Sequence, residues 1–197
     1  MKRYDIINRL AIIINAKSYL EIGVQDKKNC FDKIKIAQKI GVDPDKNSNA
    51  NFTMTSDEYF KNHCNRNFDI IFIDGLHHSQ QVLLDIENSI NRLSSNGFIV
   101  LHDCNPTEEI MQEVPRNTKV WTGDVWKAFV EIRTKRKDLC MYVIDTDFGV
   151  GIIKRGFNDV LKIETQITYN EFDKNRKQWL NLISVDEFLK MKKGCNC

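Results

Sequence analysis

The sequence predicts an α/β fold with a doubly wound, mostly parallel sheet, and three observations support this prediction. Residues 68–75 form a nearly continuous apolar run, and residues 98–101 form a second one. Such runs are typical of strands that are covered on both faces. Between them, residues 79–93 place their apolar side chains on one side of an amphipathic helix. A strand, a helix and a strand at this spacing form a βαβ unit, whose two strands are parallel.

The other elements follow from shorter patterns. Apolar residues at helical spacing predict a helix over residues 4–15, and residues 18–24 form a short predicted strand that ends in glycine. Further helices are expected at 31–37, at 57–63 with Ser56 as N-cap, and at 124–136. A second short strand is expected to end at 41–43, and an edge strand is expected at 52–55. Two closely spaced strands, 140–144 and 150–154, predict an antiparallel hairpin at the edge of the sheet.

The chain length of 197 residues suits one domain with a short appendage. We expect residues 1–156 to form the main domain, including the N-terminal helix. Residues 157–197 are polar and helix-like, and they are predicted to form a helical extension that packs on the same domain. The segment 104–123 contains two prolines and predicts a long loop, which in compact domains often covers a functional site.

Composition excludes several classes of protein. The net charge is only +2, whereas a nucleic-acid-binding protein usually carries a strong basic excess. No apolar run approaches the ~20 residues that a membrane helix needs, and no secretory signal is visible. We therefore expect a cytoplasmic protein without nucleic-acid or membrane partners, in which the six cysteines are free thiols. Cys195 and Cys197 are interpreted as part of a frayed tail, with a soft-metal site as the alternative.

Two residues at the ends of predicted strands suggest a nucleoside site. Ligands of open α/β sheets bind outside the carboxyl ends of the strands. Gly23 allows the backbone to turn and to approach a ligand closely. Asp43 ends the next strand about twenty residues later, where a carboxylate can accept hydrogen bonds from the ribose hydroxyls. The alternative is that Asp43 and Pro44 simply begin a turn.

A second group of polar residues lies after the two apolar strands: Asp74, His77, His78, His102 and Asp103. If these strands are neighbours, Asp74 and Asp103 lie side by side. Two close carboxylates repel each other unless a cation or a proton lies between them, and Mg²⁺ would meet that need. His77 is a candidate general base because imidazole titrates near neutrality. The alternative is that the aspartates cap helices and the histidines are surface residues.

At these residues the chain resembles the class I S-adenosylmethionine-dependent methyltransferases, in particular the small subgroup related to metal-dependent sugar and macrolide O-methyltransferases. The order and spacing of six segments carry the resemblance, which spans residues 19 to 154. The segments are 19–24 (YLEIGV), 40–44 (IGVDP), 55–60 (TSDEYF), 68–77 (FDIIFIDGLH), 97–103 (GFIVLHD) and 123–127 (GDVWK).

The resemblance implies a Rossmann-like, seven-stranded sheet whose last hairpin is antiparallel. It also implies a site for S-adenosylmethionine. Glu21 and Gly23 would flank the methionine part, Asp43 would hold the ribose, and Ser56 and Asp57 would lie near the adenine. Asp74 is assigned to the same cofactor site.

By the same resemblance, Asp74, His102 and Asp103 fall on metal-ligand positions for Mg²⁺ or Mn²⁺, and His77 falls on the position of a catalytic base. The implied reaction is transfer of a methyl group to a hydroxyl of a small molecule or sugar. The resemblance is compatible with a homo-oligomer but does not define the oligomeric state.

Two departures from the family pattern keep alternatives open. Asp26-Lys27-Lys28 stands where the family usually has a further glycine, and His102 stands where a carboxylate is common. A non-catalytic relative that binds the nucleoside is one alternative. A nicotinamide-dependent oxidoreductase is another, although no G-x-G-x-x-G run follows the first strand. A partner-binding role for the C-terminal helices is the third, with Trp179, Leu180, Leu182 and Phe188 as the interface.

Overall fold

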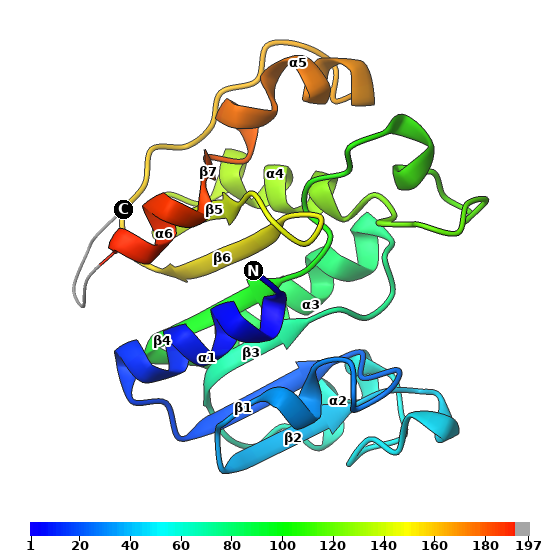
Figure 1. The fold of residues 1–197 in the computed structure, drawn as a ribbon, viewed down its shortest axis with the longest axis vertical. Coiled ribbons are helices and arrows are strands. Elements are labelled where there is room, and N and C mark those ends of the chain that lie inside the picture. Colours follow the sequence, from blue (N-terminus) through cyan, green and yellow to red (C-terminus); the bar gives the residue numbers. More distant parts are fainter. Residues whose placement is uncertain (192–197) are drawn as a thin grey trace.

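The computed structural model describes residues 1–191, and these form one mixed sheet between two layers of helices (Figure 1). The sheet has seven strands in the order β2-β1-β3-β4-β6-β5-β7. They are β1 (Ser18–Ile22), β2 (Gln38–Val42), β3 (Phe68–Ile73), β4 (Leu93–Leu101), β5 (Leu139–Ile144), β6 (Val150–Arg155) and β7 (Leu182–Ile183).

Six of these strands share one direction. The pairs β1–β2, β1–β3, β3–β4 and β5–β7 are parallel, whereas β6 runs antiparallel to both β4 and β5. The doubly wound, mostly parallel sheet and its antiparallel β5–β6 hairpin are therefore confirmed. The predicted place of the hairpin at the edge of the sheet is wrong, because β7 pairs with β5 and forms that edge. The chain continues from β1 to one side and from β3 to the other, so the strand order reverses between β1 and β3. This switch point is the place where open α/β sheets bind ligands.

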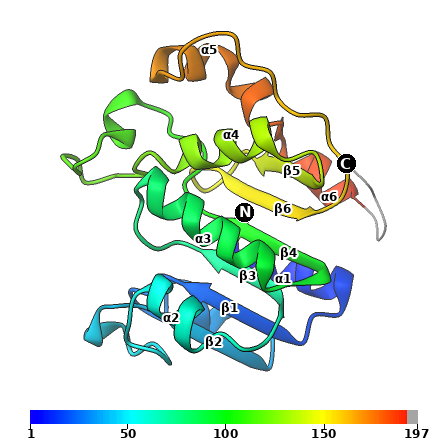
Figure 2. The ribbon, with the colours of Figure 1, turned by 180° about the vertical axis from the view of Figure 1, so that it is seen from behind.

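Helices cover both faces of the sheet. One face packs against α1 (Arg3–Ile14) and α6 (Val185–Lys190), which lie in front of the sheet in Figure 1. The opposite face carries the remaining four helices, of which α3 and α4 lie in front in Figure 2. These helices are α2 (Ser56–Asn62), α3 (Ser79–Asn91), α4 (Val125–Lys135) and α5 (Tyr169–Trp179).

The helix expected over residues 31–37 is wrong. Only one 3-10 turn, Phe31–Lys33, forms there, and Ile34 is already extended. Ile34 and Ile36 are both buried against the α1 layer, so the apolar spacing in this segment is that of extended chain rather than of a helix. As a result, β1 and β2 are joined by a loop that lacks the usual crossover helix.

The strand expected over residues 52–55 is also wrong. A single bridge joins Phe52 to Val42, and the chain then turns into α2. The turn is set by Thr55, which forms a capping box with Glu58, so Thr55 and not Ser56 is the N-cap of α2. The seventh strand is instead β7, which adds to the far edge of the sheet beside β5.

The C-terminal segment is more than a helical extension, because residues 157–191 contribute β7 as well as α5 and α6. In α5, Phe172 stacks on Trp126 of α4 with ring centroids 4.2 Å apart, and Trp179 is buried beside them. These aromatic residues therefore pack in the core. The domain boundary at 156/157 stays a prediction, and the end of the predicted extension, residues 192–197, lies outside the described residues.

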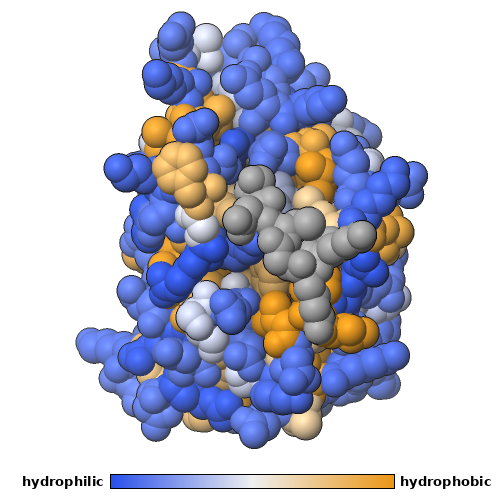
Figure 3. All heavy atoms as spheres, turned by 90° about the vertical axis from the view of Figure 1, so that its left-hand side faces the viewer, coloured by the Kyte–Doolittle hydropathy of each residue, from blue (hydrophilic) through white to orange (hydrophobic). Residues whose placement is uncertain are grey.

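The surface is mixed in character. On the face shown in Figure 3, hydrophilic residues predominate and several patches of hydrophobic residues interrupt them. Among residues 1–191, no helix is both long enough and apolar enough to cross a membrane. Of the predicted free thiols, Cys30, Cys64 and Cys104 are free and buried. The prediction is wrong for Cys140, which is disulfide-bonded. Cys195 and Cys197 lie outside the described residues.

Candidate active site

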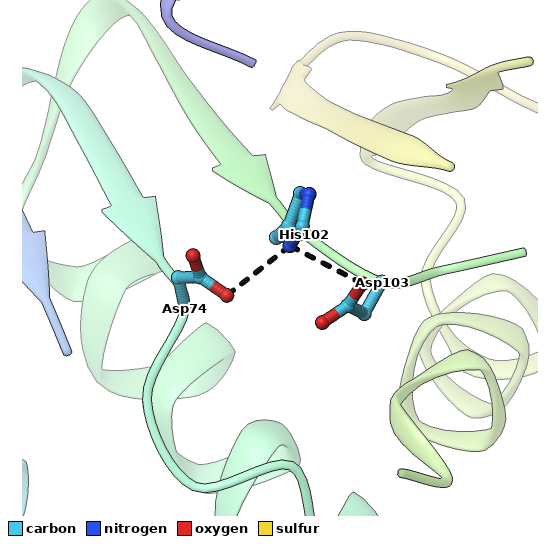
Figure 4. Close-up of side chains that lie close together, drawn as sticks. All are labelled: Asp74, His102 and Asp103. Carbon is cyan, nitrogen blue, oxygen red and sulfur yellow. Dashed lines mark ion pairs between the residues drawn. The ribbon is translucent and has the colours of Figure 1, made fainter. Parts of the chain in front are cut away.

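The carboxyl ends of β3 and β4 bring the predicted polar residues together. These strands are parallel neighbours, and their register pairs Ile73 with Leu101. Asp74 and His102 follow those two residues directly, and the backbone N–H of His102 donates to the carbonyl oxygen of Ile73 at 3.1 Å. Asp74 and His102 therefore project from adjacent strand ends, as Figure 4 shows.

His102 lies between two carboxylates. Its Nδ1 is 3.2 Å from Oδ1 of Asp74 and 3.2 Å from Oδ1 of Asp103. Asp103 has a φ of 60°, a left-handed conformation that is uncommon for a residue other than glycine and that often occurs at functional sites. One ligand atom from each of the three residues lies within 4.8 Å of the others, which is compact enough to surround a metal ion. The predicted juxtaposition of Asp74 and Asp103 is thus present.

His77 joins the same cluster from the loop after β3. Its Nε2 lies 3.4 Å from Oδ1 of Asp74, and its Nδ1 lies 3.3 Å from Oδ2 of Asp103. The imidazole also stacks on Trp121, with centroids 5.1 Å apart and planes 18° apart. Its neighbour His78 makes an edge contact with Trp121 instead of joining the carboxylates. Trp121 belongs to the loop 104–123, so this loop does reach the cluster.

Two members of the cluster were not among the sequence-predicted site residues. Asp147 lies in the turn between β5 and β6, with Oδ2 3.4 Å from Nε2 of His102. Arg3 begins α1, and its guanidinium contacts Asp74 at 3.5 Å and Asp147 at 3.2 Å. No local pattern marks either residue, because both reach the site through tertiary packing.

The charges of the cluster depend on one another. Burial alone would raise the pKa of Asp74. The charge of His102 and the hydrogen bonds of His102 and His77 lower this pKa by more, so that it lies well below its ordinary range. Burial lowers the pKa of His102, but Asp74, Asp103 and Asp147 raise it well above its ordinary value. Burial lowers the pKa of His77, but Asp74 and Asp103 raise it above its ordinary value. The aspartates therefore require positive charge nearby, which protonated imidazoles or a metal ion can supply.

Gly23 directly follows β1, at the switch point between β1 and β3. Its φ is +84°, and a Cβ added there would lie 2.2 Å from the carbonyl oxygen of Asp74. Only glycine fits both the backbone angle and this close approach. The amide of Asp74 in turn donates to the carbonyl of Ile22 at 2.8 Å. The glycine thus brings the end of β1 directly against the residue that begins the acidic cluster.

Asp43 is 7% exposed, and its carboxylate organises the loop after β1. Oδ2 accepts from the amides of Val24 at 2.8 Å and Gln25 at 2.7 Å, and Oδ1 accepts from the amide of Asp45 at 2.8 Å. The contact with the amide of Asp45 shows that Asp43 also begins a turn, which was the alternative interpretation of this residue. A carboxylate has about four acceptor positions, so three amides leave one position open for a ribose hydroxyl.

Glu21 lies inside the fold rather than on an open surface. The alternation of β1 places it on the same face as Tyr19, whose hydroxyl donates to Oε2 at 2.5 Å. Glu21 is 1% exposed, and burial raises its pKa to about 8. Its carboxyl group is therefore protonated near neutral pH in the absence of a charged ligand.

Ser56 and Asp57 lie at the start of α2, facing α3. The side-chain amide of Gln81 donates to Ser56 Oγ at 3.3 Å and to Asp57 Oδ1 at 3.1 Å. Behind them, Asp85 is buried, and burial raises its pKa to about 6. Because Thr55 caps the helix, the side chains of Ser56 and Asp57 are not needed for that purpose. They do not belong to the Asp74–His102 cluster.

Comparisons with known proteins agree with this architecture. Residues 36–104 match a family model described as a methyltransferase domain, and this segment contains Asp43, Asp74 and the ends of β3 and β4. No curated protein sequence matches the chain. The matched segment extends from β2 to the end of β4.

Solved structures show the same fold at low sequence identity. A candidate caffeoyl-CoA O-methyltransferase from Staphylococcus aureus is 16% identical, with a TM-score of 0.59, and the match covers 78% of this chain and 82% of that one. The O-methyltransferase TomG from Streptomyces achromogenes, in complex with SAM, is 12% identical, with coverages of 78% and 79% and a TM-score of 0.57. An O-methyltransferase from Bacillus cereus in complex with SAH is 14% identical, with coverages of 75% and 76% and a TM-score of 0.53.

The fold and the domain match define the class: the chain has the Rossmann-like fold of class I S-adenosylmethionine-dependent methyltransferases. The fold that the family resemblance implies is thereby confirmed. The comparisons do not favour the alternative of a nicotinamide-dependent oxidoreductase.

Proposed function

We propose that the protein is an S-adenosylmethionine-dependent O-methyltransferase that acts on a hydroxyl of a small molecule or sugar. The observation that carries this proposal is the cluster of Asp74, His77, His102 and Asp103 at the carboxyl ends of β3 and β4, beside the switch point. Two of the fold relatives, one in complex with SAM and one in complex with SAH, are O-methyltransferases, which supports the same class. We place the reaction in the cytoplasm. The proposal applies equally to a monomer and to a homo-oligomer.

The proposed cofactor site combines the switch point with the first turn of α2. Gly23 and Glu21 would flank the methionine part, Asp43 would take a ribose hydroxyl, and Ser56 with Asp57 would lie near the adenine. Asp74 is also included, since Gly23 packs against its backbone. The protonated Glu21 carboxyl can ionise when a cation such as the cofactor ammonium group comes near it.

The donor set fits a divalent metal. Asp74, His102 and Asp103 offer two carboxylates and one imidazole nitrogen in a compact group, and Nδ1 of the neighbouring His77 is buried without a hydrogen-bond partner. Carboxylate oxygens suit both Mg²⁺ and Mn²⁺. When bound, such an ion supplies Lewis acidity that lowers the pKa of an acceptor hydroxyl.

Within this site, we assign the role of general base to His77. Its contacts with Asp74 and Asp103 and its stack on Trp121 hold the ring at the edge of the cluster. From there, one ring nitrogen can take the proton of the acceptor hydroxyl as the methyl group is transferred. The loop 104–123 covers this side and would exclude water from the acceptor. The protein otherwise aligns donor and acceptor, because the sulfonium methyl is already activated.

The proposal is tested by measuring S-adenosylmethionine binding by isothermal titration calorimetry and then the formation of S-adenosylhomocysteine with a panel of sugars, sugar nucleotides and small hydroxylated compounds. Binding together with acceptor-dependent turnover is expected. Binding without turnover on any acceptor would favour the non-catalytic relative. A protein that does not bind S-adenosylmethionine at all would overturn the proposal.

A further inference from the structure

Asp147 is a buried carboxylate to which neither the family resemblance nor the proposed reaction gives a role. It lies in the turn between β5 and β6, and its side chain is only 2% exposed. Its partners come from the start of α1 and from the end of β4. They are the ammonium group of Lys2 at 2.7 Å, the backbone N–H of Arg3 at 3.1 Å, the guanidinium of Arg3 at 3.2 Å and Nε2 of His102 at 3.4 Å.

The two ring nitrogens of His102 face different groups. Nδ1 lies 3.2 Å from both Asp74 and Asp103, the proposed metal ligands. Nε2 points to the other side, where it is buried, makes no hydrogen bond of good geometry and has the Asp147 carboxylate as its ion-pair partner. The His102 side chain is itself 8% exposed, so water cannot readily take the place of Asp147.

This arrangement selects one form of the imidazole. A histidine that binds a metal through Nδ1 must be neutral and must carry its proton on Nε2. Metal-ligating histidines usually donate that second N–H to a carboxylate, which fixes both the tautomer and the orientation of the ring. We propose that Asp147 is the positioning residue that holds His102 with Nε2–H toward its own carboxylate and with the Nδ1 lone pair toward the metal.

Asp147 is held in place by the start of α1. The ammonium group of Lys2 and the guanidinium of Arg3 both form ion pairs with its carboxylate. The basic start of α1 therefore contributes to the site through Asp147.

The backbone of the turn holds Asp147 against the strand end that carries His102. Asp147, Phe148 and Gly149 have φ values of 49°, 61° and 86°. The carbonyls of Gly149 and Phe148 accept hydrogen bonds from the amides of Cys104 and Asn105 at 3.0 and 2.8 Å. Left-handed residues in succession are costly and persist where the surrounding contacts fix them. The turn and the segment after Asp103 thus form one rigid unit.

This inference rests on the metal site of the proposed function, and the test separates the two. Mn²⁺ binding to the full chain is followed by the electron paramagnetic resonance signal of free Mn²⁺. The variants are Asp147→Ala, Asp147→Asn, the ligand variant Asp74→Asn and the control Asp145→Asn. Asp145 lies in the same turn, but its carboxylate accepts from Asn105 and does not contact His102.

Asp147→Ala should weaken Mn²⁺ binding about 10- to 100-fold, the usual effect of removing such a partner. Asp147→Asn keeps an oxygen acceptor for Nε2–H and should bind with intermediate affinity, whereas Asp145→Asn should stay within about twofold of the wild type. Equal affinities for wild type and Asp147→Ala, with binding lost in Asp74→Asn, would overturn the role of Asp147 alone. A wild type that binds no Mn²⁺ would overturn the metal site, and the role of Asp147 with it.

A second measurement does not depend on the folding of any variant. In wild-type protein with ¹⁵N-labelled histidine and saturating Mg²⁺, long-range ¹H–¹⁵N spectra report which nitrogen of His102 carries the proton. The Nε2–H tautomer is expected. The Nδ1–H tautomer, or a doubly protonated ring, would overturn the proposal.

Discussion

The imidazole of His77 lies flat against the indole of Trp121, with ring planes 18° apart and centroids 5.1 Å apart. Trp121 is itself fixed, because its Nε1 donates to the carbonyl of Glu113 at 2.7 Å. The loop 104–123 is therefore joined to the proposed general base by a specific ring contact. Substitutions of His77 and of Trp121 can therefore test the proposed base and its contact with the loop.

Replacing His77 by alanine should lower turnover about 10²- to 10⁴-fold, the usual contribution of a general base. The affinity for S-adenosylmethionine should be unchanged, because His77 lies on the acceptor side of the proposed site. Turnover is measured as S-adenosylhomocysteine release, and affinity is measured by calorimetry. His78→Ala is the matched control, since His78 does not contact the carboxylates. Unchanged turnover in His77→Ala would contradict the assigned role.

Trp121→Ala should lower kcat about 10- to 100-fold, because a base that is no longer held in place loses alignment with the acceptor. Trp121→Phe keeps a flat ring and should recover most of this loss. Steady-state kinetics with the two variants provide the measurement. If alanine and phenylalanine behave alike, the stack does not position His77.

Gly23→Ala should destabilise the protein by about 2 kcal/mol or more, because the added Cβ would lie 2.2 Å from the Asp74 carbonyl at a left-handed φ. Gly75→Ala is the control. A Cβ at Gly75 would meet Ile22 at 3.5 Å, an ordinary contact, and no left-handed angle is involved. Urea denaturation of the two variants compares the free energies of unfolding. Equal losses would show that the approach of Gly23 to Asp74 is not constrained.

Asp43→Ala should weaken S-adenosylmethionine binding about 10- to 100-fold, since the carboxylate both holds the amides of Val24 and Gln25 and offers an acceptor to the ribose. The control is Asp45→Ala, whose carboxylate caps a neighbouring 3-10 turn at Lys46–Ser48. Calorimetry gives both affinities. If Asp43→Ala binds the cofactor as tightly as the control does, Asp43 stabilises only the turn and does not bind the ribose.

Glu21 should make stability depend on pH in the protein free of ligands. The folded-state pKa of about 8 exceeds the ordinary glutamate pKa of 4.5, so the folded state holds a proton that the unfolded state releases. The free energy of unfolding should therefore fall as pH rises from about 4.5 to about 8, by up to about 1.4 kcal/mol per pH unit. Glu21→Gln cannot ionise and should remove this contribution.

The measurement is urea denaturation of wild type and Glu21→Gln at pH 5, 6.5 and 8. The difference in stability between the two proteins should grow with pH in favour of the variant. The same substitution at the exposed Glu164 controls for the change in net charge. A constant difference across the three pH values would contradict a buried, protonated Glu21.

The main parts of the site were predictable because they depend on local sequence and on one rule of sheet geometry. The apolar runs before Asp74 and before His102 indicate two buried parallel strands, and the carboxyl ends of such strands meet at one edge. Their polar end residues consequently lie together, as the 3.2 Å contact between Asp74 and His102 shows. Gly23 and Asp43 follow from the same rule at the neighbouring strands.

The weaker predictions failed where spacing alone was ambiguous. Ile34 and Ile36 were assigned to a helix, but both are buried in extended chain under α1. Phe52 was assigned to an edge strand, but it makes only one bridge because the capping box at Thr55 begins α2. In both segments, packing against a neighbouring element decided the conformation.

The sequence by itself determined the α/β class, the parallel core and the residues at the strand ends, because apolar runs and turn residues fix these features locally. Only the tertiary structure decided which distant groups complete the cluster. Arg3 and Asp147 are 144 residues apart, yet they form an ion pair and Asp147 also contacts His102, because α1 packs across the sheet beside the β5–β6 turn. Such a contact leaves no periodic pattern in the chain, since it arises from the packing of whole elements rather than from the spacing of residues within one.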